Sequence, residues 1–162
     1  MSDPRDLRRL AALARYDLRS PAAREALDDL AERAATLAGS PIGLVSVVLD
    51  DAQFFAGRHG LDGWLDEVGG TPIEWSFCAD VVRSEDALEV PDAQADARYA
   101  TNPLVTEDGV RCYLGVPLRS PDGYVLGSLC VIGTDERQFE DHLHGALRSL
   151  ADEAVAALPR RD

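Results

Sequence analysis

Residues 110–133 read VRCYLGVPLRSPDGYVLGSLCVIG, and this stretch decides the fold class. Two runs rich in branched apolar residues, 110–118 and 124–132, flank the tetrad SPDG at 120–123. Proline and aspartate favour tight turns, and glycine accepts the left-handed backbone that such turns require. The stretch therefore predicts a long antiparallel β-hairpin.

Further strands and helices are expected on both sides of this hairpin. The branched run 42–49 and the segment QFFAGR (53–58) predict a second hairpin, and 87–90 predicts a short strand. The expected helices cover the first 19 residues with a start at Asp3 and Pro4, then 21–38, 77–84, and a last helix from residue 134 or 135 to 158. Strands with flanking helices predict an α+β architecture with an antiparallel sheet and helices segregated on one side.

Composition and charge exclude several classes of function. The 162 residues fit one domain, and 16 basic against 29 acidic residues give a net charge of −13. This charge disfavours binding to nucleic acid and to anionic membranes. All the basic residues are arginine, which excludes lysine Schiff-base chemistry, pyridoxal phosphate attachment and a P-loop. We expect a cytoplasmic location, because no apolar run suits a membrane span or a secretory signal.

The three cysteines, Cys78, Cys112 and Cys130, have neither disulfide-framework nor zinc-site spacing. Cys78 follows a predicted helix start, where the helix dipole would lower a thiol pKa. Cys112 and Cys130 lie on the two arms of the hairpin, and the strand register decides whether they are neighbours. The histidines His142 and His144 point to different helix faces, so no metal site and no catalytic residue is assigned.

Three blocks of sequence carry a resemblance to a known family. They are WSFCADVV (75–82), LEVPDAQADARYATNPLV (88–105) and GVRCYLGVPLRSPDGYVLGSLCVIG (109–133). In order and spacing they resemble the GAF domains whose motifs are SFC, VPDA..D.R...NPLV and Y.G.PL...DG...G.LCVI. The resemblance implies a GAF/PAS-like fold: a central antiparallel β-sheet, N- and C-terminal helices packed on one face, and a loop-covered pocket on the other.

The resemblance extends more loosely over 24–158 and implies a simple organisation. We expect an N-terminal helical extension (1–19), a single GAF domain (20–158) and a tail (159–162), with no output domain. A small molecule is expected to bind between the sheet and the loops 57–71 and 93–106. The sequence indicates no particular ligand or cofactor.

The expected ligand-binding residues combine ring faces with polar groups. For each of them, a structural role in the core or in a turn is the alternative. The set comprises Phe55, Trp75, Phe77, Cys78, Asp92, Asp96, Arg98, Tyr99, Asn102, Tyr113 and Cys130.

Some stand-alone GAF proteins reduce free methionine sulfoxide with a cysteine in a CDAASNSE-type loop. The corresponding segment here, YATNPLVTEDGV (99–110), holds no cysteine. We therefore expect a non-enzymatic sensor that acts as a homodimer through its terminal helices or through a signalling protein partner. Two alternatives stay open: a thiol redox switch or reductase-like enzyme using Cys78 or Cys112, and a ligand-free interaction scaffold.

Overall fold

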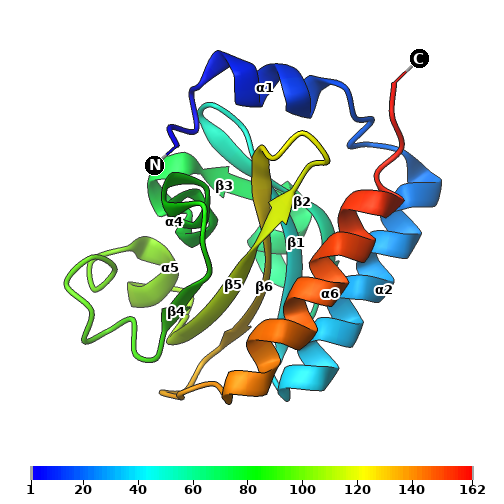
Figure 1. The fold of residues 1–162 in the computed structure, drawn as a ribbon. Coiled ribbons are helices and arrows are strands. Elements are labelled where there is room, and N and C mark those ends of the chain that lie inside the picture. Colours follow the sequence, from blue (N-terminus) through cyan, green and yellow to red (C-terminus); the bar gives the residue numbers. More distant parts are fainter. Residues whose placement is uncertain (1, 162) are drawn as a thin grey trace.

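The structure is a computed structural model that describes residues 2–161. Its centre is a six-stranded sheet in the order β3-β2-β1-β6-β5-β4, in which all neighbouring strands are antiparallel (Figure 1). The α+β class predicted from the sequence is confirmed. The strands are β1 (Ile42–Val48), β2 (Ala52–His59), β3 (Gly70–Pro72), β4 (Leu88–Val90), β5 (Cys112–Arg119) and β6 (Val125–Gly133).

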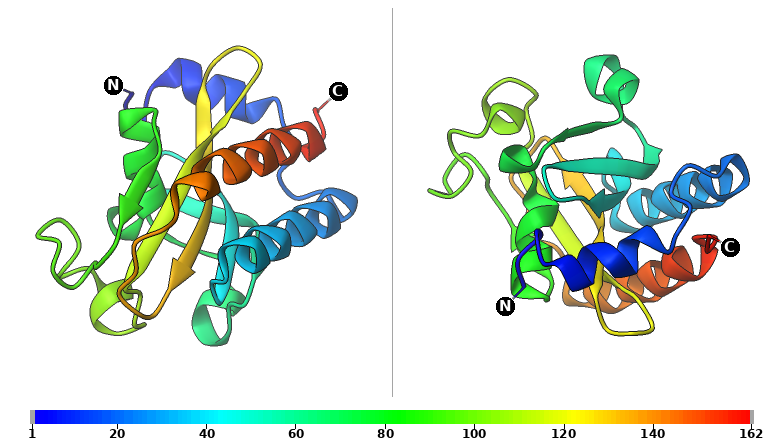
Figure 2. Two further views of the ribbon diagram at one scale, coloured as in Figure 1. Left: turned by 60° about the horizontal axis from the view of Figure 1, so that its bottom comes forward. Right: turned by 90° about the horizontal axis from the view of Figure 1, so that it is seen from above.

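Two long helices, α2 (Pro21–Ala38) and α6 (Asp141–Ala157), lie side by side over one face of the sheet (Figures 1 and 2). The range of α2 agrees with the prediction, because Ser20 caps its first turn and Gly39 ends it in the left-handed conformation with φ 66°. The main core lies between these helices and the sheet. This arrangement confirms the helix-covered face of the expected fold.

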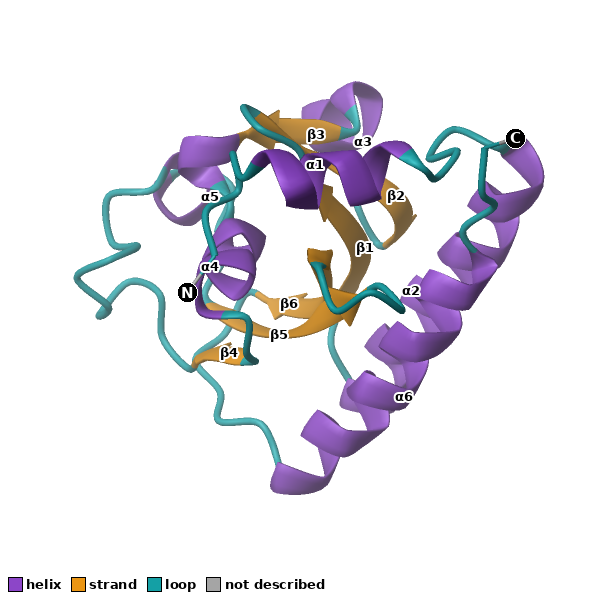
Figure 3. Ribbon diagram, turned by 45° about the horizontal axis from the view of Figure 1, so that its top comes forward, coloured by secondary structure: helices purple, strands orange, loops and turns teal. Residues whose placement is uncertain are grey.

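The opposite face of the sheet is covered by short elements (Figure 3). They are α3 (Gly63–Val68), the 3-10 turn η1 (Ile73–Trp75), α4 (Phe77–Ser84) and α5 (Pro103–Thr106). A second apolar cluster fills the space between α4 and the sheet. Because these elements are short and joined by loops, the side chains between them leave room for a cavity on this face.

Helix α1 (Leu7–Ala14) crosses the end of the sheet beside the β5–β6 hairpin, as the right-hand view of Figure 2 shows. The predicted cap at Asp3 is wrong: the Asp6 carboxylate accepts from the Arg8 amide, whereas Asp3 accepts from Arg5 in a preceding turn. The chain first makes a turn at residues 4–5, in which the Asp6 amide donates to the Asp3 carbonyl oxygen at 2.9 Å, so the helix begins only after Asp6.

The predicted start of the last helix at residue 134 or 135 is also wrong, because α6 begins at Asp141. The preceding segment 134–140 has no regular structure. The backbone of this segment bonds to the loop after β4, since the Arg137 amide donates to the Pro91 carbonyl oxygen at 3.0 Å. A contact with a loop distant in sequence therefore delays the helix.

Candidate functional site

A cavity of about 120 Å³ lies between the sheet and the short covering elements. Side chains two residues apart on a strand face the same side, which brings β1, β2, β5 and β6 together in its wall. The lining residues are Ile42, Leu44, Gln53, Phe55, Gly60, Leu61, Asp62, Leu65, Phe77, Cys78, Leu104, Asp108, Val110, Tyr113, Cys130 and Ile132. The wall is mainly apolar, and its charged members are the two carboxylates Asp62 and Asp108.

A thiol and hydroxyl cluster lies on the sheet side of the cavity. Cys78 Sγ lies 3.1 Å from Tyr113 Oη and 3.9 Å from Cys130 Sγ. Tyr113 Oη in turn lies 3.0 Å from Ser128 Oγ. Side-chain hydrogen bonding with Cys130 and with Tyr113 lowers the pKa of Cys78, although burial opposes this shift. The same pairing and burial raise the pKa of Cys130.

A second polar cluster centres on the buried Gln53 amide. Its Oε1 accepts from Ser46 Oγ at 2.9 Å and from Ser76 Oγ at 2.8 Å, while its Nε2 donates to Thr71 Oγ1 at 2.7 Å. Ser76 also caps α4 by accepting from the Ala79 amide. Gln53 thus joins three elements around the cavity wall. Gln53 was not predicted as a site residue, because a glutamine in an amphipathic strand has the pattern of a solvent-facing residue.

Helix α3 closes the cavity on its outer side. The Trp64 indole N–H donates to Asp108 Oδ1 at 3.0 Å, which joins α3 to the segment after α5. Trp64 also meets Trp75 edge to face, with ring centroids 6.1 Å apart. Leu61, Asp62 and Leu65 from the same segment line the cavity. We call residues 60–68 the lid; the Trp64–Asp108 bond is one of its contacts across the cavity.

The family model for the GAF domain matches residues 22–158 of this chain. The chain belongs to the GAF domain family. GAF domains are common regulatory and sensing modules, although some GAF proteins, such as free methionine-R-sulfoxide reductases, are enzymes. Across residues 2–161, no helix is long and apolar enough to cross a membrane.

A relative in sequence is a cyclic di-GMP phosphodiesterase of Pseudomonas aeruginosa, 36% identical over 70% of this chain. The chain spans only 19% of that relative's length, so the match concerns one part of a larger signalling protein.

Two solved structures show the shared fold. The GAF domain of an Acinetobacter phosphoenolpyruvate-protein phosphotransferase has a TM-score of 0.70 and 18% identity, covering 93% of this chain and 90% of that one. A type II free methionine-R-sulfoxide reductase from Thermoplasma acidophilum has a TM-score of 0.68 and 14% identity, covering 83% and 91%. At these identities both comparisons concern the fold alone.

Five of the predicted site residues come together in the cavity wall of this GAF domain. They are Phe55, Phe77, Cys78, Tyr113 and Cys130. Their role in ligand binding stays a prediction. Cys112 lies apart from them: it pairs with Gly133 whereas Cys130 pairs with Gly115, so the two thiols belong to opposite faces of the sheet.

The other six predicted residues lie outside the described cavity wall, engaged with other parts of the GAF domain. Asp92 bonds Arg111 at 3.0 Å, which lowers the pKa of Asp92. Asp96 pairs with Arg98 at 2.8 Å. The remaining three support neighbouring elements. The Tyr99 ring stacks on Phe77, and its hydroxyl group donates to Asp80. Asn102 caps α5 and donates to the Trp75 carbonyl oxygen, while the Trp75 ring packs edge to face against Trp64. The loop 93–106 was expected to cover the ligand, and its residue Leu104 lines the cavity.

Breaking the bond between Trp64 and Asp108 is expected to loosen the lid of this GAF domain. In Asp108→Ala the indole loses its acceptor, at a cost of about 1 kcal/mol to lid closure. We expect amide hydrogen exchange in residues 63–68 to accelerate about fivefold, with a red shift of tryptophan emission. Glu107→Ala removes the same charge one residue earlier and serves as control. Equal exchange rates in the two variants would contradict the role of this bond.

Proposed function

We propose that this chain is a regulatory module that binds a small molecule in the cavity beneath the lid and signals through contacts of its helices. The cavity is the observation that carries the proposal, since an apolar pocket with a few convergent polar groups is the usual form of a small-molecule site. The related segment of a cyclic di-GMP phosphodiesterase supports a role in signalling. A cytoplasmic location is part of the proposal, because three free cysteines suit a reducing compartment.

The size and charge of the cavity limit the ligand. A volume of about 120 Å³ is close to the roughly 150 Å³ of an engineered cavity that binds benzene, and below the roughly 300 Å³ of ordinary ligand sites. A ligand larger than one ring therefore requires displacement of the lid. Asp62 and Asp108 in the wall favour a neutral or cationic compound over an anion.

Strand β1 offers a path from the cavity to the helical face. Leu44 lines the cavity, while the adjacent Gly43 lies against the backbone of Ala31 in α2. Because this contact is close, a displacement of β1 on ligand binding is expected to move α2. Leu37, on the outer side of α2, is 49% exposed and offers an apolar contact for a second copy. Homodimerisation through the terminal helices thus stays part of the proposal.

Filling the cavity is the direct test of ligand binding. Ile132 lies in the cavity wall and is only half-buried, so the larger side chain in Ile132→Trp takes up space in the cavity with little cost to the core. We expect native mass spectrometry of freshly purified wild-type protein to show a bound mass that denaturation removes. In Ile132→Trp this mass should fall at least about tenfold, which corresponds to about 1.4 kcal/mol of lost affinity.

The matched control for this variant is Leu7→Trp, which adds the same side chain at an exposed position of α1. It should retain the bound mass at the wild-type level. A bound mass that persists in Ile132→Trp would place the ligand outside the cavity. A wild-type protein without any bound mass, even after incubation with small neutral and cationic aromatic compounds, would contradict the proposal.

A further inference from the structure

We propose that Cys78 and Cys130 form a redox-active dithiol that reduces small hydroperoxides and closes to a reversible disulfide. This activity goes beyond ligand sensing, and it does not require that the cavity bind any other molecule. The sequence could not pair these two thiols, because the proximity of Cys78 to Cys130 depends on the packing of α4 against β6.

The geometry of the two sulfurs supports this pairing. Their Sγ atoms lie 3.9 Å apart, and a disulfide bond requires about 2.05 Å, so the sulfurs must approach by about 2 Å. A side-chain rotation with a small displacement of α4 covers this distance. Cys112 lies in the core beneath α2 and α6, on the opposite face of the sheet, and has no comparable partner among the described cysteines.

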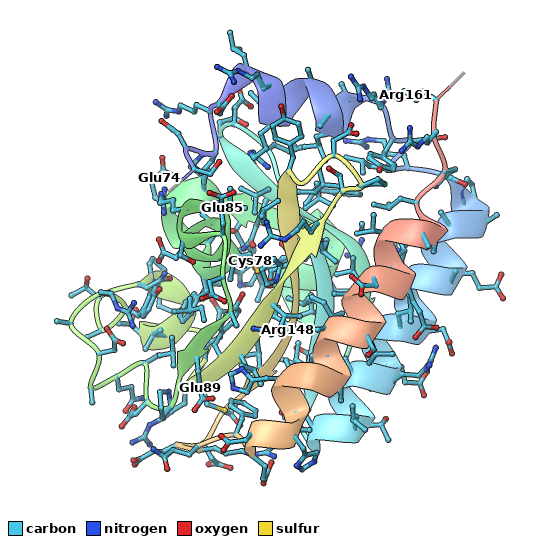
Figure 4. The ribbon with its side chains drawn as sticks, viewed as in Figure 1. Glu74, Cys78, Glu85, Glu89, Arg148 and Arg161 are labelled. Carbon is cyan, nitrogen blue, oxygen red and sulfur yellow. The ribbon has the colours of Figure 1, made fainter. Side chains whose placement is uncertain are left out.

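The surroundings of the pair suit reaction with a small oxidant. Both side chains are buried, yet both line the cavity, and Figure 4 shows Cys78 near the middle of the molecule between α4 and the sheet. A volume of about 120 Å³ corresponds to about four water molecules at roughly 30 Å³ each, enough for hydrogen peroxide but not for a bulky oxidant.

Hydrogen bonds divide the roles of the two thiols. Cys78 stands in the first turn of α4, within hydrogen-bond reach of Cys130 and Tyr113. Once Cys78 ionises it can only accept, so both partners then donate to it and stabilise the thiolate. Tyr113 is itself bonded to Ser128, which orients its hydroxyl group. Cys130 retains its proton at the same pH, since its pKa is raised. Cys78 is therefore the attacking thiol, and Cys130 resolves the intermediate.

The reaction has two steps. The Cys78 thiolate attacks the terminal OH oxygen of ROOH; the S–O bond forms and the O–O bond breaks. RO⁻ takes up from water the proton that Cys78 released on ionising, and leaves as ROH. The Cys130 sulfur then attacks the Cys78 sulfur of the sulfenic acid; the S–S bond forms, the S–O bond breaks, and the departing hydroxide takes the Cys130 proton as water. Two thiols are oxidised and one hydroperoxide is reduced. Two molecules of a low-molecular-weight thiol restore the dithiol by exchange: the first forms a mixed disulfide with one cysteine, and the second displaces that cysteine and leaves as the small-molecule disulfide.

The full chain treated with hydrogen peroxide tests the proposal by peptide mapping. Cleavage after arginine places each cysteine in its own peptide: Cys78 in 59–83, Cys112 in 112–119 and Cys130 in 120–137. We expect a crosslink between 59–83 and 120–137 that dithiothreitol removes, while Cys112 stays free to alkylate after denaturation. Cys78→Ser and Cys130→Ser should lose the crosslink completely, and Cys112→Ser should keep it within twofold of the wild type.

The intermediate gives a second readout. In Cys130→Ser, the sulfenic acid on Cys78 has no resolving thiol, so dimedone should label peptide 59–83 far more than in the wild type. The wild-type crosslink decides the question even if a variant fails to fold. A crosslink that involves Cys112, oxidation of Cys78 without any crosslink, or three free thiols after excess peroxide would each overturn the proposal.

Discussion

Replacing Gly43 with alanine is expected to lower the free energy of unfolding by about 3 kcal/mol and the melting temperature by about 9 °C. Gly43 lies in β1 where α2 crosses the sheet, and a Cβ atom at this position would overlap the carbonyl oxygen of Ala31. It would also lie 3.0 Å from the Ala31 carbonyl carbon and 3.2 Å from Ala35 Cβ.

The expected loss is large because the obstacle is backbone. A flexible side chain could rotate away from a new methyl group, but the Ala31 carbonyl is fixed by the hydrogen bonds of α2. Gly57 on the neighbouring strand meets Leu27 of the same helix in the same way, with the Leu27 carbonyl carbon 2.5 Å from the position of a Cβ. The helix therefore contacts the sheet at two glycines, and alanine at either position would push α2 outward and open the main core.

Gly145→Ala is the matched control for this variant. Gly145 lies on the exposed side of α6, and a Cβ there would meet no atom within 4 Å. Alanine should stabilise the helix by about 0.5–1 kcal/mol, because glycine is a poor helix former. Urea unfolding followed by circular dichroism measures both variants. Equal stability of Gly43→Ala and the wild type would mean that α2 does not contact β1 as closely as described.

Local signals made much of the fold predictable. The range of α2 followed from Ser20, Pro21 and Gly39, and the β5–β6 hairpin followed from its turn residues. These features depend on residues adjacent in sequence. The start of α6 could not be found in this way, because the segment before it is held by a loop that follows β4.

The cavity was predictable only in part. The SFC motif indicated Phe77 and Cys78, whereas Gln53, Asp62 and Asp108 had no distinguishing pattern. Ligand-binding residues were predicted in the loop around Asp92 and Arg98 because this loop is rich in polar groups. Those groups form ion pairs within the domain, a use that depends on partners such as Arg111, which is distant in sequence.

The second large effect is expected at Arg9, which sequence patterns place on a surface helix but whose side chain is fully buried. Its guanidinium donates to backbone carbonyl oxygens of three segments: Pro4 at 2.6 Å, Val48 at 2.7 Å and Val125 at 3.3 Å. The planar fork of arginine suits several acceptors at once. Burial lowers the pKa of Arg9, while Asp6, Asp3 and Asp50 oppose this shift. The Arg9 side chain thus links α1 by hydrogen bonds to the end of β1 and the start of β6.

We expect Arg9→Met to lower the free energy of unfolding by about 2–4 kcal/mol, because buried carbonyl oxygens lose their donors. Amide exchange in α1 should rise further than exchange in α2, since α1 has few other contacts with the sheet. Arg8→Met makes the same substitution at an exposed position of the same helix and should change stability by less than about 0.5 kcal/mol.

Arg9→Lys separates the charge from the shape of the donor group. A lysine keeps the positive charge, yet a single ammonium cannot reach carbonyl oxygens on three segments and loses more solvation when buried. It should therefore destabilise the protein nearly as much as methionine does. Full rescue by lysine would show that charge alone holds α1 in place. Loss of stability in both variants with normal exchange in α1 would mean that Arg9 stabilises the sheet ends rather than the helix.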